Sequence, residues 1–212
     1  MNRGLLITFE GIDGCGKSTQ LNKLADWFKS NGRSVLVVRE PGGTSIGEKI
    51  RNILLDKKND EMCSVTELLL YEAARAQITS QVIRPAIEEG KIVICDRFYD
   101  STFAYQGYAR GLGEKLVRDL NETATEGLAP NITFLLDLTA EDAYKRRKGR
   151  GEAEDRLEAM GLDFQKAVRE GYLVLAENDY RIRRIDASKS IDDIFETIVG
   201  EVEKEIAACG TR

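Results

Sequence analysis

Histidine is absent from the 212 residues of this sequence. Its absence excludes Ser-His-Asp and Cys-His triads, histidine-ligated zinc sites, and every imidazole general acid or base. Any chemistry that the chain carries out must therefore use carboxylates, Lys, Arg, hydroxyl groups, backbone amides or a metal ion held by oxygen atoms.

Cysteine and proline are scarce, with four and three residues respectively. No two cysteines have the C-x-x-C spacing, so a zinc site is not expected, and a reduced, cytoplasmic protein is the simplest interpretation. Because prolines are few and no low-complexity tract interrupts the chain, there is no sign of a linker. Residues 1–212 are therefore expected to form one domain.

Long apolar runs are also missing, since no stretch approaches the roughly 18 apolar residues of a membrane span. The apolar segment near the N-terminus is too short for a signal peptide. Basic charge is not in excess, because 31 Lys and Arg stand against 36 Asp and Glu, a net charge of −5. Nucleic-acid binders neutralise phosphates with basic side chains, so a nucleic acid is not expected as a partner. Without an apolar span, a membrane is not expected as a partner either.

Short apolar runs without polar alternation recur along the chain. They predict strands at residues 5–9, 35–38, 92–95, 132–136 and 182–185. Since helical patterns separate them, we expect an α/β fold: a three-layer α/β/α sandwich with a parallel sheet of about five strands. In such sheets ligands bind beyond the carboxyl ends of the strands.

The helices are predicted from apolar residues at i, i+3, i+4 and i+7. The helix after the first strand has this spacing at Leu21, Leu24, Ala25 and Phe28. Capping-box spacing at residues 64–67 predicts a helix that runs toward Gly90 with a kink near Pro85. Further helices are expected from about Asp100 and from Glu114, and others flank the last strand.

Residues 11–18 match the P-loop pattern G-x-x-x-x-G-K-[ST], with a predicted strand before it and a helix after it. Its glycines let backbone amides converge on phosphates, and the helix N-terminus adds a positive dipole. Lys17 is expected to reach the outer phosphates and Ser18 to bind Mg²⁺. The fold is therefore expected to be of the P-loop NTPase type, and the predicted ATP-binding residues are Gly11, Ile12, Asp13, Gly14, Cys15, Gly16, Lys17, Ser18 and Thr19.

Two further strands are predicted to end on a carboxylate. Asp96 follows the third strand and is the candidate partner of Ser18 at a Mg²⁺ ion, with Asp137 at the end of the fourth strand as its rival. Arg97 can donate two parallel hydrogen bonds to a phosphate group.

Several segments together resemble the thymidylate kinase (dTMP kinase) family. They are residues 9–14, 39–44, 73–75, 96–98, 101–107 and 155–156. The resemblance implies transfer of the γ-phosphoryl group of ATP to dTMP, giving ADP and dTDP for dTTP synthesis, with Mg²⁺ as cofactor. It also implies a homodimer.

The resemblance assigns a dTMP contact to individual residues. Arg97 would hold the dTMP phosphate, and Asp13 would face the sugar 3′-hydroxyl. Tyr71 would stack on thymine where the family usually has Phe, and Arg75 would donate to a thymine carbonyl. Ser101 and Thr102 would face the base, Tyr105 would pack against the deoxyribose, and Gln106 is a weaker candidate. The full set of implied substrate residues is Asp13, Tyr71, Arg75, Arg97, Ser101, Thr102, Tyr105 and Gln106.

Some members of the family carry an arginine inside the phosphate loop, where this chain has Gly14, and others supply it from a mobile lid. Residues 145–150 hold five basic side chains in six and precede Gly151, a candidate hinge. A small lid is therefore expected at about 145–156, with Arg150 as the first candidate for a catalytic arginine and Arg146 as the second. The predicted catalytic set is Lys17, Arg97, Asp13, Arg150 and Arg146.

Two other functions remain open at this point. A kinase of another nucleoside monophosphate, UMP, CMP or AMP, would use the same phosphate loop. A nucleotide-dependent switch without acceptor phosphorylation would also bind a triphosphate, but it leaves residues 96–107 unexplained.

Overall fold

A computed structural model of the chain describes residues 4–149 and 154–210. Its centre is a five-stranded sheet with the order β2-β3-β1-β4-β5, in which every neighbouring pair is parallel. The strands are β1 (Leu5–Glu10), β2 (Val35–Arg39), β3 (Ile92–Asp96), β4 (Ile132–Asp137) and β5 (Ile182–Asp186). The predicted parallel sheet of about five strands is confirmed.

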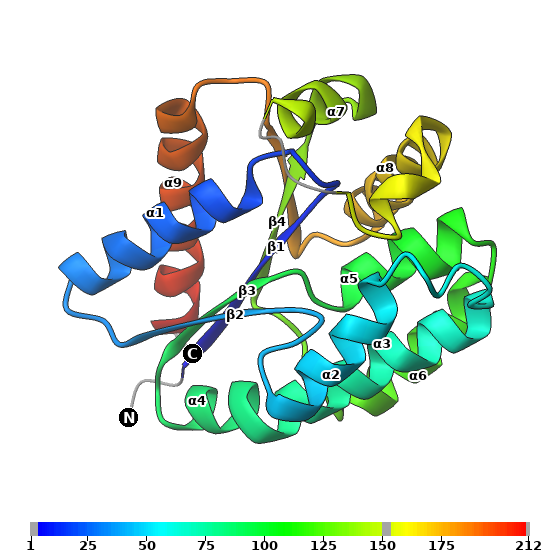
Figure 1. Cartoon of the computed structure of the whole chain (residues 1–212). Helices are drawn as coiled ribbons and strands as arrows, with labels where there is room; N and C mark the ends of the chain where they lie inside the picture. Colours follow the sequence, from blue (N-terminus) through cyan, green and yellow to red (C-terminus); the bar gives the residue numbers. More distant parts are fainter. Residues whose placement is uncertain (1–3, 150–153, 211–212) are drawn as a thin grey trace.

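Helices cover both faces of this sheet, as expected for a three-layer sandwich. Figure 1 shows α1 (Lys17–Ser30) and α9 (Ile191–Gly210) together on one face. The side chains of β1 that point to this face, Leu5, Ile7 and Phe9, are buried in one apolar core with residues of both helices. The amphipathic spacing read from residues 21–28 therefore places the apolar stripe of α1 against the sheet.

The opposite face carries α4 (Arg84–Glu88), α5 (Tyr99–Thr102) and α8 (Leu162–Asn178). The alternate side chains of β1 point to this face, and two of them, Thr8 and Glu10, are polar and fully buried. The Thr8 hydroxyl lies 2.6 Å from the Thr133 hydroxyl of β4. Polar groups inside a strand must find partners across the layer, and those of Glu10 belong to the site.

The helix predicted from residue 64 to residue 90 is divided. The chain forms α3 (Ser64–Ile78), a π-helical turn, η1 (Thr79–Ile83), and then α4. The distortion precedes Pro85 because a proline ring displaces the carbonyl group four residues before it. The predicted capping box is wrong, since Cys63 is the N-cap residue and no side chain caps the helix.

One helix, α2 (Ser45–Leu55), was not predicted. Its first turn is held by the Thr44 hydroxyl, which accepts a hydrogen bond of 2.9 Å from the Gly47 amide. The remaining elements are η2 (Phe103–Ala109), α6 (Glu114–Thr125), α7 (Ala140–Lys148) and η3 (Glu158–Met160). Among the described residues, no helix combines the length and the apolarity that crossing a membrane requires.

Candidate active site

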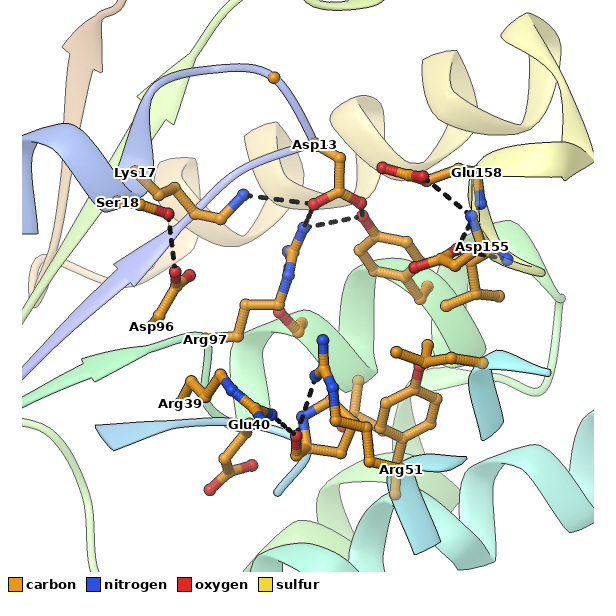
Figure 2. Close-up of a pocket in the computed structure, with 18 of the residues that line it drawn as sticks. Asp13, Lys17, Ser18, Arg39, Glu40, Arg51, Asp96, Arg97, Asp155 and Glu158 are labelled. Atoms are coloured by element: carbon orange, nitrogen blue, oxygen red, sulfur yellow. Dashed lines mark hydrogen bonds and ion pairs between the residues drawn. The ribbon is translucent and has the colours of Figure 1, made fainter. Parts of the chain in front are cut away.

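A cavity of about 520 Å³ opens at the carboxyl ends of β1, β2 and β3. Figure 2 shows Asp13, Lys17 and Arg97 at one end of it and Arg39 and Arg51 at the other. Most of the predicted site residues line this one space: Asp13, Gly14, Gly16, Lys17, Ser18, Tyr71, Arg75, Asp96, Arg97, Ser101, Thr102, Tyr105 and Gln106. Residues from four separate segments of the sequence thus meet where ligands bind in a parallel sheet.

The glycines of the phosphate loop are required by its backbone. Gly14 and Gly16 have φ angles of 93° and 104°, which side chains rarely tolerate. A Cβ atom at Gly14 would also collide with the carbonyl oxygen of Ala143 in α7. The loop therefore has no room at residue 14 for the arginine that some family members carry there.

Lys17 begins α1 and folds back over the loop. Its ammonium group donates to the carbonyl oxygens of Gly11 (2.9 Å) and Ile12 (3.1 Å) and lies 3.7 Å from Asp13. The Ile12 and Cys15 side chains belong to the apolar core, so these two residues present only backbone to the loop. Lys17 is thus held at the mouth of the loop, within reach of phosphates that the loop would bind.

Ser18 and Asp96 meet as predicted for a cation site. The Ser18 hydroxyl donates to a carboxylate oxygen of Asp96 over 3.2 Å (Figure 2). The rival carboxylate, Asp137, does not line the cavity, and it accepts hydrogen bonds from Arg169 (2.6 Å) and Arg184 (2.8 Å). Both guanidinium groups compete with any cation there, so the geometry favours Asp96.

Arg97 has a left-handed backbone, with φ 69°, directly after β3. Its guanidinium donates to Asp13 (2.6 Å), to the Gly11 carbonyl (2.9 Å) and to the Tyr105 hydroxyl (3.2 Å). Burial alone would raise the pKa of Asp13, but Arg97 and Lys17 together hold that pKa well below its usual range. Two cationic side chains therefore flank one ionised carboxylate at the end of the cavity nearest the phosphate loop.

Arg75 is 1% exposed and lies in a cluster of buried polar groups. It donates to Glu40 (2.8 Å), Glu72 (2.7 Å) and the Thr102 hydroxyl (2.7 Å). Burial raises the pKa of Glu40 to about 7, although Arg75 opposes that shift. The structure thus places Arg75 and Thr102 on the cavity wall, with most of the Arg75 donors directed to the protein.

The other implied substrate residues are held in different ways. Gln106 donates to Glu67 over 2.7 Å, and Tyr71 is half-buried on α3. The Ser101 hydroxyl donates to Glu10 over 2.6 Å rather than lying free to face a base. Ser101 therefore contacts both the cavity and the buried layer behind it.

The lid predicted at about 145–156 is only partly described, and Arg150 lies outside the described residues. Arg146 is on the exposed side of α7, whereas its neighbour Arg147 is 9% exposed and lines the cavity. Arg147 lies 3.6 Å from Glu154 and 3.7 Å from Glu158. Its charge also contributes to the lowered pKa of Asp13.

Sequence reasoning missed several residues of the wall. Arg39 and Arg51 each donate to the Pro41 carbonyl over 2.9 Å, and Arg51 stands on the helix α2 that was not predicted. Asp155 and Glu158 also line the cavity. A signal existed for Arg39, Pro41 and Asp155, because they fall within segments that carried the resemblance.

Comparisons with known proteins agree with that resemblance. The family model described as thymidylate kinase matches residues 9–198. The thymidylate kinase of Thermoanaerobacter sp. (strain X514) is 51% identical over 203 residues, which cover 95% of this chain and 98% of the relative. The thymidylate kinase of Caldanaerobacter subterraneus subsp. tengcongensis is 49% identical over 203 residues, covering 95% of this chain and 96% of the relative. That of Chlorobium luteolum is 49% identical, with 92% and 95% covered.

Proposed function

Because this chain belongs to the thymidylate kinase family and transfers the γ-phosphoryl group of ATP to dTMP, we propose a role for each part of its cavity. One observation carries the assignment: Lys17 of the phosphate loop and Arg97 after β3 lie on either side of Asp13, at 3.7 Å and 2.6 Å. Two anionic substrates that meet head to head need cationic groups from both sides.

ATP is proposed to bind through the backbone amides of residues 11–19. Lys17 would exchange its bonds to the loop carbonyls for bonds to the outer phosphates, at little cost in reorganisation. A phosphate oxygen needs little activation as a nucleophile, so positioning and charge neutralisation account for most of the catalysis. This chemistry suits a chain that has no histidine.

Mg²⁺ is proposed as the cofactor, and the residues present fit it. Ser18 and Asp96 offer a hydroxyl and a carboxylate oxygen 3.2 Å apart, and hard cations prefer oxygen ligands. When bound, Mg²⁺ neutralises charge that develops on the phosphates. Clusters of three or more His, Cys, Asp or Glu suited to a metal are absent from the described residues, so the remaining ligands would be phosphate oxygens and water.

dTMP is proposed to lie in the rest of the cavity. Arg97 would bind its phosphate through Nε and through Nη2, which would exchange its bonds to Asp13 and the Tyr105 hydroxyl for bonds to the phosphate. Nη1 would keep its bonds to the Gly11 carbonyl and the Tyr172 hydroxyl. Asp13 and Tyr105, whose hydroxyl lies 3.4 Å from Asp13, would face the sugar. The base would lie between Tyr71 and Arg75 of α3 on one side and Ser101, Thr102 and Gln106 on the other.

Closure of a lid at about 145–156 is proposed to bring further positive charge to the phosphoryl group. Arg147 already lines the cavity, and Arg150 and Arg146 remain candidates from the sequence. The collision that a Gly14 side chain would make with Ala143 supports this proposal, because it leaves the loop without an arginine of its own. A closed lid would also keep water from ATP, so ATPase activity without dTMP is expected to be low.

The chain is further proposed to form a cytoplasmic homodimer. Four large apolar side chains on α2 and α3 are about half exposed: Ile46 (52%), Ile53 (46%), Val65 (47%) and Leu69 (51%). The two helices pack against each other, so these residues can form one continuous apolar surface. The cytoplasmic location is proposed from the reaction, which uses the nucleotides ATP and dTMP.

The proposed function is tested by ADP release with ATP, Mg²⁺ and a panel of dTMP, UMP, CMP and AMP. Activity with dTMP at least about 100-fold above the others is expected, since the wrong base would leave buried polar groups of the cavity unpaired. Equal activity on UMP or CMP would contradict the proposed thymine contacts. Nothing in the structure favours either alternative function over dTMP phosphorylation.

A further inference from the structure

Glu10, the last residue of β1, is fully buried and is not among the residues that line the cavity. One carboxylate oxygen accepts a hydrogen bond of 2.7 Å from the Phe98 amide. The other accepts from the Ser101 hydroxyl at 2.6 Å and from the Tyr172 hydroxyl at 2.8 Å. This carboxylate therefore collects donors from the segment after β3, from α5 and from α8, and it does not line the cavity.

The same two hydroxyl groups contact Arg97. Its Nη1 donates to the Tyr172 hydroxyl over 3.0 Å and to the Ser101 hydroxyl over 3.3 Å. Each hydroxyl has one hydrogen to donate, and the two oxygens lie 2.8 Å apart. Whether Tyr172 donates to Glu10 directly or through Ser101, the chain of donors ends on the Glu10 carboxylate.

An ionised Glu10 is a pure acceptor, so it draws the hydroxyl hydrogens toward itself. The lone pairs of both hydroxyl oxygens are then left for the N–H groups of Arg97. If the carboxylate became an amide, its NH₂ group would donate to these oxygens and turn their hydrogens toward the guanidinium. The acceptor at residue 10 thus decides whether two neighbours attract Arg97 or repel it.

Glu10 also holds the backbone at Arg97. The left-handed φ of 69° is unusual for a residue with a side chain. The Arg97 amide donates to the Phe9 carbonyl over 3.0 Å, and the following amide, that of Phe98, donates to Glu10. Both amides around the unusual φ are therefore fixed by the end of β1.

We propose that Glu10 is a positioning residue for the dTMP phosphate, because it orients the Ser101 and Tyr172 hydroxyls and the Phe98 amide and so fixes the guanidinium of Arg97. The proposal rests on the proposed function, in which Arg97 binds that phosphate. It assigns Tyr172 to the same network, on a helix far from the motifs of the sequence.

The test compares dTMP with thymidine, which lacks the phosphate. The measured quantity is the dissociation constant of thymidine divided by that of dTMP, both obtained by calorimetry. This ratio reports what Arg97 contributes to binding of the phosphate. Burial and the nearby Asp100 raise the pKa of Glu10 to about 7, so binding is measured about one pH unit above that value, where residue 10 is ionised and the dTMP phosphate is a dianion.

Glu10→Gln keeps the size of the side chain and changes its donor pattern. It is expected to weaken dTMP binding about tenfold or more, to leave thymidine binding within about twofold, and to raise KM for dTMP but not for ATP. Tyr172→Phe, which keeps the ring, is expected to lower the same ratio about three- to tenfold. If the Glu10 variant does not fold, the Tyr172→Phe result tests the positioning role on its own.

Two controls separate the possible failures. Thr8→Val removes a buried hydroxyl from the same strand, where it contacts Thr133, and is expected to leave the ratio unchanged. Arg97→Met is expected to lower the ratio about 100-fold. If it does not, the proposed role of Arg97 fails. If it does, but Glu10→Gln and Tyr172→Phe keep the wild-type ratio, or weaken thymidine and dTMP binding equally, the positioning role is overturned.

Discussion

Lys17 shows how much a single residue of this site does before any substrate arrives. Its ammonium group is held by two loop carbonyls, at 2.9 and 3.1 Å, and is 6% exposed. Such a group is held close to the position where negative charge develops, so only an exchange of these two bonds is needed before it stabilises that charge.

Replacement of this residue by Lys17→Met is expected to lower kcat about 10²- to 10³-fold, because one fixed donor to the phosphates is lost. The dissociation constant of dTMP should change little, since Lys17 serves the ATP side. Steady-state kinetics together with dTMP calorimetry check both expectations. Lys23→Met, half-buried on the same helix and paired with Asp192 outside the cavity, is the matched control.

The two candidate carboxylates for Mg²⁺ make opposite predictions. Asp96→Asn is expected to raise the Mg²⁺ concentration for half-maximal activity about tenfold or more, because a ligand or its hydrogen-bonded neighbour is weakened. Asp137→Asn should leave that concentration within about twofold and reduce stability instead, since Arg169 and Arg184 lose their partner. A Mg²⁺ titration of both variants that gave the reverse order would refute the assignment to Ser18 and Asp96.

For single residues, the sequence predicts a role where that role follows from a local motif or from the position at the end of a strand. Lys17, Ser18, Asp96 and Arg97 follow strands or fill motif positions, so their place at the sheet edge could be inferred from spacing. Glu10 could not be assigned, because its three donors come from residues 98, 101 and 172 and only the tertiary structure joins them.

Helix α7 and the segment after it form the element on which the lid proposal depends. Arg156, at the far end of the proposed lid, donates to the Leu54 carbonyl of α2 over 2.7 Å and lies 2.6 Å from Glu67. Residue 156, at one end of the proposed lid, is thus anchored to α2 and α3.

Arg147→Met and Arg150→Met are each expected to lower kcat about 100-fold or more, since an inserted arginine can account for larger factors than this. Arg146→Met should have a smaller effect, about tenfold at most, because its side chain is exposed on α7. Lys145→Met, which loses only a surface pair with Asp142, is the control. Wild-type kcat in all three arginine variants would refute the lid.

The apolar surface on α2 and α3 gives a prediction about assembly. Ile53→Glu or Leu69→Glu is expected to convert the proposed dimer to a monomer at micromolar concentration, because each places a charge in a buried apolar interface. Light scattering after size-exclusion chromatography measures the mass directly. Tyr180→Glu, at a 91% exposed position away from these helices, should not change it.

Elements with a clear apolar pattern were predicted well, and irregular ones were not. Strands β1 to β4 are short, mostly apolar runs, and α1 has apolar residues at helical spacing; tertiary structure does not override either pattern. Helix α2 was missed because its start depends on the Thr44 hydroxyl as N-cap. Thr44 ends a Gly-rich segment that was predicted to be a loop, so its capping role was not recognised. The π-helical turns η1 and η2 have no period of their own, since each is a local widening of an otherwise helical pattern.

In the molecule as a whole, buried carboxyl groups rather than imidazoles determine how stability depends on pH near neutrality, since the chain has no histidine. Burial raises the pKa values of Glu10 and Glu40 to about 7 in the folded protein. Between the unfolded value of 4.5 and about 7, the native state therefore binds more protons than the unfolded state. Stability from these two groups is complete below the unfolded pKa and is lost as the pH rises through the folded one.

The free energy of unfolding is accordingly expected to fall by a few kcal/mol between about pH 5 and pH 7.5, since one pKa unit corresponds to about 1.4 kcal/mol. Urea unfolding at a series of pH values measures this slope. Glu40→Gln, which cannot ionise, should flatten it. A free energy that rises over the same interval would show that these carboxyls do not keep their protons in the folded state.

The close approach of Gly14 to the Ala143 carbonyl has an evolutionary consequence. A thymidylate kinase of this kind cannot acquire an arginine in its phosphate loop by one codon change at residue 14, because α7 occupies the volume that the new side chain requires. Exchange between the two ways of supplying that arginine would need α7 to retreat first. Because the contact is with the backbone of α7, an arginine at residue 14 should accompany a displaced α7 rather than a single change at residue 143.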